Sequence, residues 1–348
     1  MAFTIDGATL DRLSVHNVGN KSADDYIVLT KEEAELYPEI ENLLRTYFIK
    51  PFKLDEFFSF FHDSDVNLNE VYVYVSSIFE NPDSLHEQSI NLAKHLYSKC
   101  NHPKIKGGEF YVAYFSDCTV DGIGCNAVGI FKSESKETFL KVSPNGDVFE
   151  FEPHVGININ KLDKGCIVFN AQREDGYVVA LVDNTNKSVE ARYWTDEFLN
   201  VQQRKDNYYK TQNVLSMCKT FVSEELPRHF EVSKADQADL LNKSVAYFKE
   251  NESFTFDEFT GEVLSHPEVV ETFNSFRESY QQSRDVVIDD SFEISDSAVR
   301  KQSRGMKSVI KLDKNFHIYV HGDKNRIVKG YDPETGLNFY QLFFDNEE

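Results

Sequence analysis

The sequence lacks an apolar run long enough to cross a membrane. Its longest runs, VYVYV at 71–75 and VVAL at 179–182, fall far short of the roughly 20 residues that a membrane helix needs. The opening residues, MAFTIDGATLDRL, show no basic segment followed by an apolar one, so they do not resemble a secretory signal. The sequence therefore predicts a cytoplasmic protein with no membrane partner.

Cysteine is scarce and unpatterned. The five cysteines form no CxxC pair and their number is odd, which is typical of reduced thiols. Cys118 and Cys125 flank the turn TVDGIG and could face each other across a hairpin, but a reducing compartment disfavours a bridge. The group His95, Cys100 and His102 matches no standard zinc spacing, so no metal is predicted.

The motifs of several enzyme classes are also missing. The chain contains no GxGxxG after a strand, no GxxxxGK[ST], no HExxH, no DxDxDG and no GxSxG, which argues against a Rossmann enzyme, an NTPase, a zincin and an α/β-hydrolase. Cys166 and His154 could form a nucleophile and its base only if Cys166 were unusually reactive, and its place at the head of an apolar strand is typical of a buried thiol. We expect no enzymatic activity and no cofactor.

Basic side chains are few: 37 lysines and arginines face 58 aspartates and glutamates, a net charge of −21. They gather, however, between residues 299 and 329, where nine cations stand against only Asp313 and Asp323, a local net charge of +7. Because charges are screened over about 8 Å at physiological salt, the local field outweighs the total. This segment can therefore bind phosphates, although more weakly than a basic protein would.

What is present describes a globular chain of 348 residues, 41% hydrophobic and 14% aromatic. Residues 8–30 alternate like a pair of strands, and Thr30 with Glu33 forms a capping box that predicts the start of a helix. Two more helical patterns follow, although VYVYV alone would also suit a strand. From Gly107 to residue 184 six short alternating segments separated by turns predict an antiparallel meander.

Helical patterns return after residue 213, and one of them begins with a second capping box at Thr255 and Glu258. Four alternating segments close the chain. This order predicts an α+β fold: an N-terminal domain with a central antiparallel sheet and flanking helices, then a helical region and a small C-terminal antiparallel sheet. We expect one domain over 1–200 and a second over 201–348.

The stretch VQQRKDNYYKTQN, residues 201–213, lies at this predicted boundary. Its composition is typical of a solvated connection. As a DNA contact it would hold phosphates through Arg204, Lys205 and Lys210, and its tyrosines, Tyr208 and Tyr209, could stack on unpaired bases. Both interpretations stay open from the sequence.

Several strings, taken in their order, resemble one known family. They are LDRLSVHNVGN, GGEFYVAYFSD, NAVGIFKSESKETFLKV, INKLDKGCIVFN, YWTDEFLNVQQRKDNYYKTQNVL and IKLDKNFHIYVHGDKNRIVKGYDPETGLNFY. Together they span nearly the whole chain and are similar to the bacterial nucleoid-associated proteins of the NdpA or YejK type. The resemblance implies a cytoplasmic protein that associates with the nucleoid through DNA, without catalytic activity or cofactor, and it supplies no contact residues.

These observations lead to one main hypothesis, which is weak, sequence-independent DNA binding through phosphate contacts by a chain that could act as a homodimer. The predicted contact residues are Arg300, Lys301, Arg304, Lys307, Lys311, Arg204, Lys205 and Lys210. The alternative is an acidic adaptor or charge mimic that a protein partner, such as a DNA-processing enzyme, recruits to the nucleoid. Substituting the cations with glutamate separates the two, because only the first hypothesis needs them.

Overall fold

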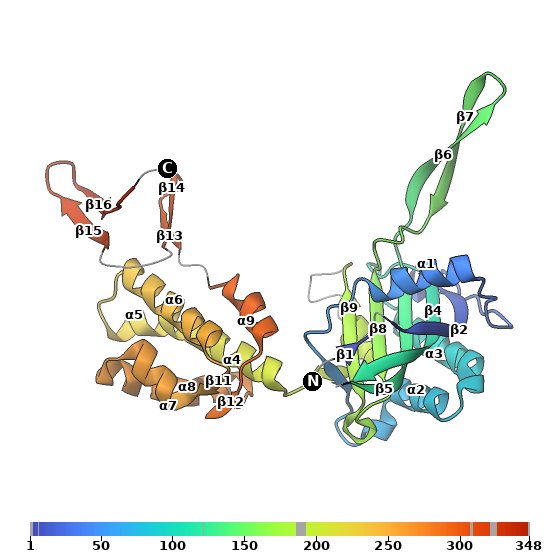
Figure 1. Ribbon diagram of the computed structural model, residues 1–348, viewed down its shortest axis with the longest axis horizontal. Coiled ribbons are helices and arrows are strands. Elements are labelled where there is room, and N and C mark those ends of the chain that lie inside the picture. The colour runs from blue at the N-terminus through green and yellow to red at the C-terminus, as the bar shows by residue number, and fades with distance from the viewer. Residues whose placement is uncertain are drawn as a thin grey trace. The chain divides into compact units, whose positions relative to one another are not determined.

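The chain forms two compact units, Met1–Arg204 and Lys205–Glu348. In the computed structural model, shown in Figure 1, the described residues are 3–5, 7–120, 122–185, 193–306, 309–320 and 326–346. The predicted α+β architecture is confirmed: the first unit is built on an antiparallel sheet, and the second is helical with small antiparallel hairpins.

An eight-stranded antiparallel sheet forms the first unit. Its order is β1-β4-β5-β8-β9-β3-β10, and β2 pairs with the same strand, β4, as β1 does. The strands are β1 (Phe3–Thr4), β2 (Thr9–Val18), β3 (Phe58–Phe60), β4 (Gly108–Val120), β5 (Ile123–Ser133), β8 (Lys164–Phe169), β9 (Val178–Asp183) and β10 (Val201–Gln203). The period-two pattern of the sequence predicted the longer strands β2, β4, β5, β8 and β9. It did not predict the short strands β3 and β10.

Both faces of this sheet are covered. Side chains of β4 alternate between two hydrophobic clusters: Phe110 and Val112 belong to one, whereas Tyr111 and Phe115 belong to the other. The first cluster packs under helices α2 (Glu70–Glu80) and α3 (Leu85–Lys99), and the second under α1 (Pro38–Ile49). The sheet is therefore the middle layer of three.

Helix α1 starts later than the capping box predicted. Tyr37 occupies the N-cap position and Pro38 is the first helical residue, as suits a ring that fixes φ near −65° and disfavours helical geometry in the residue before it. The hydroxyl of Thr30 instead donates to the carbonyl oxygen of Val15 at 2.8 Å. The second strand of the pair predicted over residues 8–30 is also wrong, since only Val28 forms a bridge, with Asn17.

The ambiguous VYVYV segment is helical. Val71, Val75 and Ile78 recur at helical spacing along α2, and all three are fully buried against the sheet. Asn69 caps this helix by accepting the backbone N–H of Tyr72 at 3.0 Å. A cap followed by a one-sided apolar stripe outweighs the strand propensity of valine and tyrosine.

Two of the six predicted meander strands leave the sheet. Strands β6 (Glu137–Asn145) and β7 (Val148–Gly156) pair only with each other and project as a long two-stranded ribbon (Figure 1). Their side chains are mostly exposed. We call this element the β6–β7 ribbon.

The second unit is a helical cluster around an aromatic core. Its helices are α4 (Asn207–Thr220), α5 (Leu226–His229), α6 (Lys234–Glu250), α7 (Phe256–Phe259), α8 (Pro267–Arg284) and α9 (Asp296–Ser303). Phe221, Phe248, Phe254, Phe259 and Phe273 are buried among them. A capping box of Ser233 and Asp236 opens α6, but the predicted one at Thr255 is wrong, because its side chain makes no cap hydrogen bond.

Three two-stranded antiparallel sheets complete this unit. Their strand pairs are β11 (Ser253–Thr255) with β12 (Ser291–Glu293), β13 (Val309–Leu312) with β14 (Phe316–Tyr319), and β15 (Ile327–Asp332) with β16 (Leu337–Leu342). Ile310 of β13 and Val320 pack on Ala235 and Ala238 of α6. The predicted terminal strands are thus present as separate two-stranded sheets.

Candidate nucleic-acid interface

The predicted basic segment begins on the short helix α9. The hydroxyl of Ser295 caps this helix by accepting the backbone N–H of Ala298 at 3.5 Å. Ala298 and Val299 are buried, whereas Arg300 and Lys301 are exposed. The helix therefore buries one side and turns its cations to solvent.

Three cations share one side of α9 and its C-cap. Arg300, Lys301 and the C-cap residue Arg304 are all exposed. At about 100° per residue, these positions fall within roughly a third of the helix circumference. They also lie at the negative end of the helix dipole, which stabilises positive charge.

Helix α4 adds a fourth cation to this group. It packs against α9, and the Nζ of Lys301 lies 5.5 Å from the centre of the Tyr208 ring on α4. Lys219, in the last turn of α4, lies beside Gly305, which follows α9 closely in the chain. If residue 305 had a Cβ atom, the Nζ of Lys219 would be 3.5 Å from it. Only packing brings Lys219 here, so the sequence pattern could not have indicated it.

Lys311 lies in a neighbouring hollow of the same unit. Lys234 of α6 and Lys311 of β13 line a hollow of about 300 Å³, together with Ser223. Ser223 follows Lys219 by about one helical turn, so this hollow lies near Lys219 of α4. Lys234 donates to the Oε1 of Gln237 at 2.7 Å.

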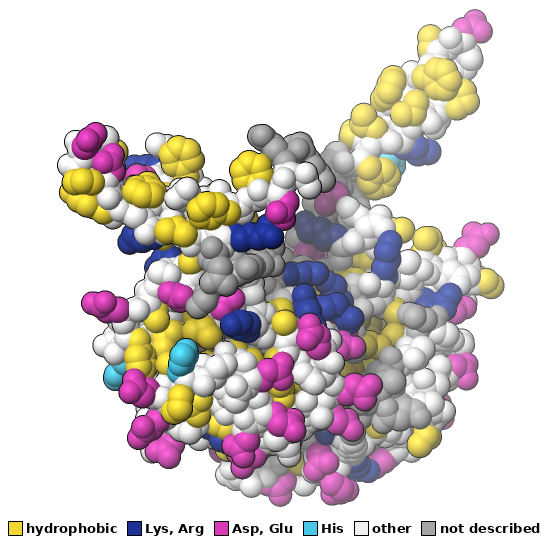
Figure 2. Space-filling model, turned by 60° about the vertical axis from the view of Figure 1, so that its left-hand side comes forward, with side chains coloured by type: hydrophobic (Ala, Val, Ile, Leu, Met, Phe, Trp, Pro, Cys, Tyr) yellow, Lys and Arg dark blue, Asp and Glu magenta, His cyan; other side chains and the backbone are white. Residues whose placement is uncertain are grey.

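We refer to these six residues as the basic surface: Lys219, Lys234, Arg300, Lys301, Arg304 and Lys311. Within the described part of the chain, Lys219, Arg300, Arg304 and Lys311 form no ion pair. In Figure 2, lysine and arginine side chains gather beside the C-terminal hairpins, whereas aspartate and glutamate predominate on the helices below. Lys219, Arg300, Arg304 and Lys311 are therefore not neutralised by the described acidic residues of their own unit.

Arg204, a predicted contact, is built into the first unit instead. Its guanidinium donates to the Oγ of Ser59 at 2.7 Å, to the carbonyl oxygen of Tyr177 at 3.0 Å and to the Oε1 of Gln172. Its backbone N–H donates to the carbonyl oxygen of Phe57 at 2.9 Å. A phosphate could bind Arg204 only by displacing these partners.

The remaining predicted contacts are divided. Lys205 is exposed, whereas Lys210 forms an ion pair of 2.7 Å with Asp289. Tyr208 is buried, so it cannot stack on a base without leaving the core. Lys307 lies outside the described residues.

Residues 201–213, left open by the sequence, form regular structure in place of a solvated connection. They comprise β10 and the first half of α4. Asp206 caps α4 by accepting the backbone N–H of Tyr209 at 3.0 Å. The cap explains why the helix begins seven residues earlier than the apolar pattern from Val214.

Cys166 does not have the surroundings of a nucleophile. It is fully buried in β8, and burial raises the pKa of its thiol. A thiol with a raised pKa holds little of the reactive thiolate near neutral pH.

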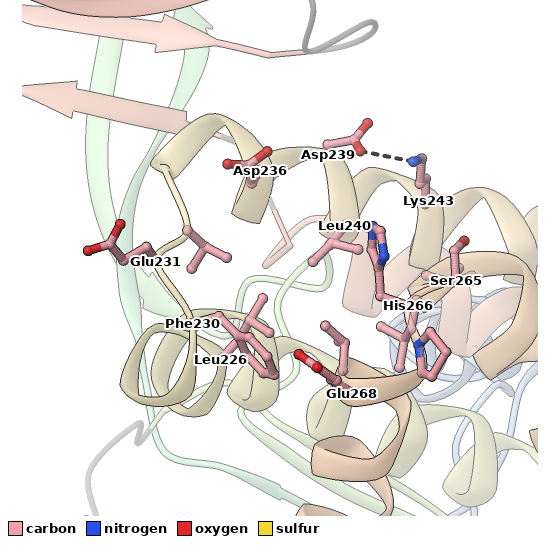
Figure 3. A pocket seen from close by; sticks show the side chains of 15 residues that line it. Leu226, Phe230, Glu231, Asp236, Asp239, Leu240, Lys243, Ser265, His266 and Glu268 are labelled. Carbon is pink, nitrogen blue, oxygen red and sulfur yellow. Dashed lines mark ion pairs between the residues drawn. The ribbon is translucent and has the colours of Figure 1, made fainter.

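A second candidate site is a groove of about 710 Å³ in the helical unit (Figure 3). Leu226, Phe230 and Leu240 point into it, and the acidic side chains of Glu231 and Glu268 border it (Figure 3). A neighbouring hollow of about 530 Å³ shares Phe230 and Glu268 and adds further carboxylates. We call the two together the acidic groove.

The carboxylates of the acidic groove are only partly neutralised. Asp239 pairs with Lys243 at 3.0 Å across one helical turn. Glu231, Glu268 and Glu271 form no ion pair among the described residues. An apolar floor with unpaired negative charge around it favours a ligand that is apolar and positively charged.

Comparison with known proteins identifies the family. A family model described as nucleoid-associated protein YejK matches residues 14–337. The chain belongs to this family. No curated protein matches the chain.

The YejK family match runs through both units, from within β2 to the first residue of β16. It includes every predicted contact residue and both candidate sites. The resemblance drawn from the sequence is therefore confirmed at the level of the family. Among the described helices of this YejK-family chain, none is both long and apolar enough to cross a bilayer.

Proposed function

We propose that this cytoplasmic protein associates with the bacterial nucleoid by binding DNA weakly and without sequence preference. The supporting observation is the basic surface, where the exposed cations Lys219, Arg300, Arg304 and Lys311 form no ion pair within the described residues. Lysine and arginine side chains bind phosphate oxygens in any sequence, and each contact releases counterions. The net charge of −21 keeps the affinity low, because the rest of the chain repels the same phosphates.

The residues that we propose to carry the contact are Arg300, Lys301, Arg304, Lys311 and Lys219. Lys205 is exposed and could join them, whereas Arg204 and Lys210 serve the fold through the partners described above. In this arrangement no helix reads base edges, so we expect no preference among duplex sequences. We also propose that the chain has no catalytic activity and no cofactor.

The test is a charge reversal at the basic surface. We expect Lys219→Glu, Arg300→Glu and Arg304→Glu together to abolish most duplex binding, because they remove three phosphate contacts and add repulsion. Fluorescence anisotropy of labelled duplex, titrated over a range of salt concentrations, measures this. Each lost contact should reduce the salt slope by about 0.9.

The matched control is Lys94→Glu, an exposed cation on α3 of the first unit, which should leave binding within about twofold of the native protein. Binding of the triple variant at native strength would refute the proposal. So would native protein that fails to bind duplex even at low salt. A parallel titration with single-stranded DNA shows which form is preferred.

A second candidate function is supported by the acidic groove. As an adaptor, the chain would hold a basic, partly apolar segment of a protein partner there, and that partner would bring it to DNA. The unpaired Glu231, Glu268 and Glu271 beside an apolar floor favour this possibility. The two functions need different surfaces, so substitutions at one should spare the other.

A further inference from the structure

The β6–β7 ribbon has a continuous register and no neighbour in its own sheet. Nine residue pairs join its strands, from Glu137 opposite Gly156 to Asn145 opposite Val148. Gly146 takes a φ of +60° in the connecting turn, a conformation that glycine adopts without strain. The ribbon projects from the first unit (Figure 1).

The register sorts the ribbon into an apolar and a polar face. Directly opposite residues share a face, and successive residues alternate between faces. One face carries Thr138, Leu140, Val142, Pro144, Phe149, Phe151, Pro153 and Val155. The other carries Glu137, Phe139, Lys141, Ser143, Asn145, Val148, Glu150, Glu152, His154 and Gly156.

The polar face is internally paired. Glu152 lies 3.5 Å from the Nζ of Lys141 and 3.2 Å from the Nε2 of His154. Asn145 donates to Glu150 at 3.2 Å, and Phe139 stacks on the His154 ring with 5.6 Å between centroids. Every charged residue of the two strands is on this face, so water is its natural surrounding.

The apolar face is open to solvent and uncharged. Its exposed fractions are 61% for Leu140, 51% for Val142, 67% for Phe149, 63% for Phe151 and 69% for Val155. A lone two-stranded hairpin is at best marginally stable in water, and a contiguous apolar patch of this kind marks an interaction surface. The face therefore needs a cover.

The geometry points to the same face of a second copy of this chain as that cover. A two-fold arrangement places Val142 and Phe151, the central pair, at the middle of both ribbons, and sheets stack in this way about 10 Å apart. Because no charge lies on the face, two copies meet without leaving a charge unpaired. Interfaces between identical subunits are also the most apolar class.

The size of the patch fits such a dimer. A covered phenylalanine buries about 150–250 Å², so the five exposed side chains contribute on the order of 500 Å² per chain. Two chains then approach the roughly 1,000 Å² that a specific interface needs. DNA does not fit this face, because the face carries no cation that could bind phosphates. The ribbon as a whole, residues 137–156, holds four acidic residues and one lysine, so it repels a polyanion.

The first test is the mass of the full chain in solution by light scattering after size exclusion. We expect a dimer at micromolar concentration, and a monomer when Phe149→Glu and Phe151→Glu are combined. The matched control, Glu150→Gln with Glu152→Gln on the polar face, should stay dimeric. Circular dichroism confirms that the variants are folded.

The second test locates the contact by a short bis-maleimide reagent. Val142→Cys should give a covalent dimer, whereas Ser143→Cys, one residue away on the polar face, should not. Cys100, Cys118, Cys166 and Cys218 are buried, whereas Cys125 is partly exposed, so both substitutions are made in a Cys125→Ser background. Equal cross-linking of both variants, a monomeric native protein, or a dimer that survives the two phenylalanine substitutions would each overturn the inference.

This inference does not rest on DNA binding. The ribbon variants leave the basic surface intact, and the basic-surface variants leave the ribbon intact. Loss of the dimer with retained DNA binding, or the reverse, therefore identifies which of the two proposals fails.

Discussion

At the scale of single residues, the sequence showed which side chains are cationic but not which of them are free. Arg204 and Arg300 look alike in the sequence, since each begins a short basic stretch. The guanidinium of Arg204 is hydrogen-bonded to the carbonyl oxygen of Tyr177 and to the Oγ of Ser59, which lie 27 and 145 residues away in the sequence. Arg300 has no such partner within the described ranges. Contacts this distant along the chain follow from the tertiary fold, so no local pattern could separate the two.

His16 gives a prediction at this scale. It is buried, with its Nδ1 accepting the backbone N–H of Thr30 at 3.2 Å and its Nε2 donating to the Oγ of Ser89 at 2.8 Å. Burial, with a smaller contribution from His86, lowers the pKa of His16 to about 4. The unfolded chain, with a pKa near 6.5, then binds the proton first. Stability should be lost as the pH falls from about 6.5 toward 4, by on the order of 3 kcal/mol at most.

The measurement is thermal or urea unfolding of the native protein and of His16→Gln between pH 7.5 and pH 5. The variant should be less stable at pH 7.5, because glutamine fits these hydrogen bonds imperfectly. The difference between the two proteins should shrink at pH 5, since only the native protein loses the contribution of His16. A difference that stays constant across this range would contradict the assignment.

At the scale of elements, alternation identified strands but not their neighbours. β6 and β7 show the same period of two as β4 and β5, so the sequence predicted all six meander strands. The period reports that a strand has two faces, and it carries no information on which sheet covers them. The start of α1 was misjudged for a different reason. Pro38 is the first residue of the helix, whereas the capping-box pattern at Thr30 resembles a helix start but begins no helix.

The acidic groove between α5, α6 and α8 gives a prediction at this scale. We expect a labelled synthetic helix with leucines on one face and lysines around it to bind the full chain. Glu231→Lys with Glu268→Lys should weaken that binding about tenfold or more, because attraction becomes repulsion. Fluorescence anisotropy of the peptide measures it.

Glu278→Lys is the matched control for this groove. Glu278 is exposed on α8 and lines neither part of the groove, so its reversal should change the affinity little. A peptide of the same composition with glutamate in place of lysine should not bind. Equal binding of the two peptides would exclude charge complementarity as the basis.

At the scale of the whole molecule, each hydrophobic cluster stays within one unit. The clusters on the two faces of the sheet lie before Lys205, and the two clusters of the helical part lie after it. The sequence predicted a division close to this point from the change of pattern, and independent folding stays a prediction. The sequence could not reveal the acidic groove or the position of Lys219 beside α9, because both arise only when helices distant in sequence pack together.

We therefore expect residues 1–204 and 205–348 to fold when expressed separately, because each has its own buried core. Cooperative thermal unfolding of both fragments by circular dichroism checks this. The second fragment should also bind duplex DNA with nearly the salt slope of the full chain, since the basic surface lies within it. A fragment that is unfolded in isolation would show that the units depend on each other.

The uncovered face of the β6–β7 ribbon has a consequence for how long such an acidic chain could stay bound to DNA. Ribbons joined in pairs give one assembly two basic surfaces, so the first contact tethers the second. Binding at the second site then depends on an effective concentration set by the tether, and avidity can exceed the single-site affinity by about 10²–10⁴ without any new contact. Weak individual contacts would thus give residence on long DNA while short duplexes are released.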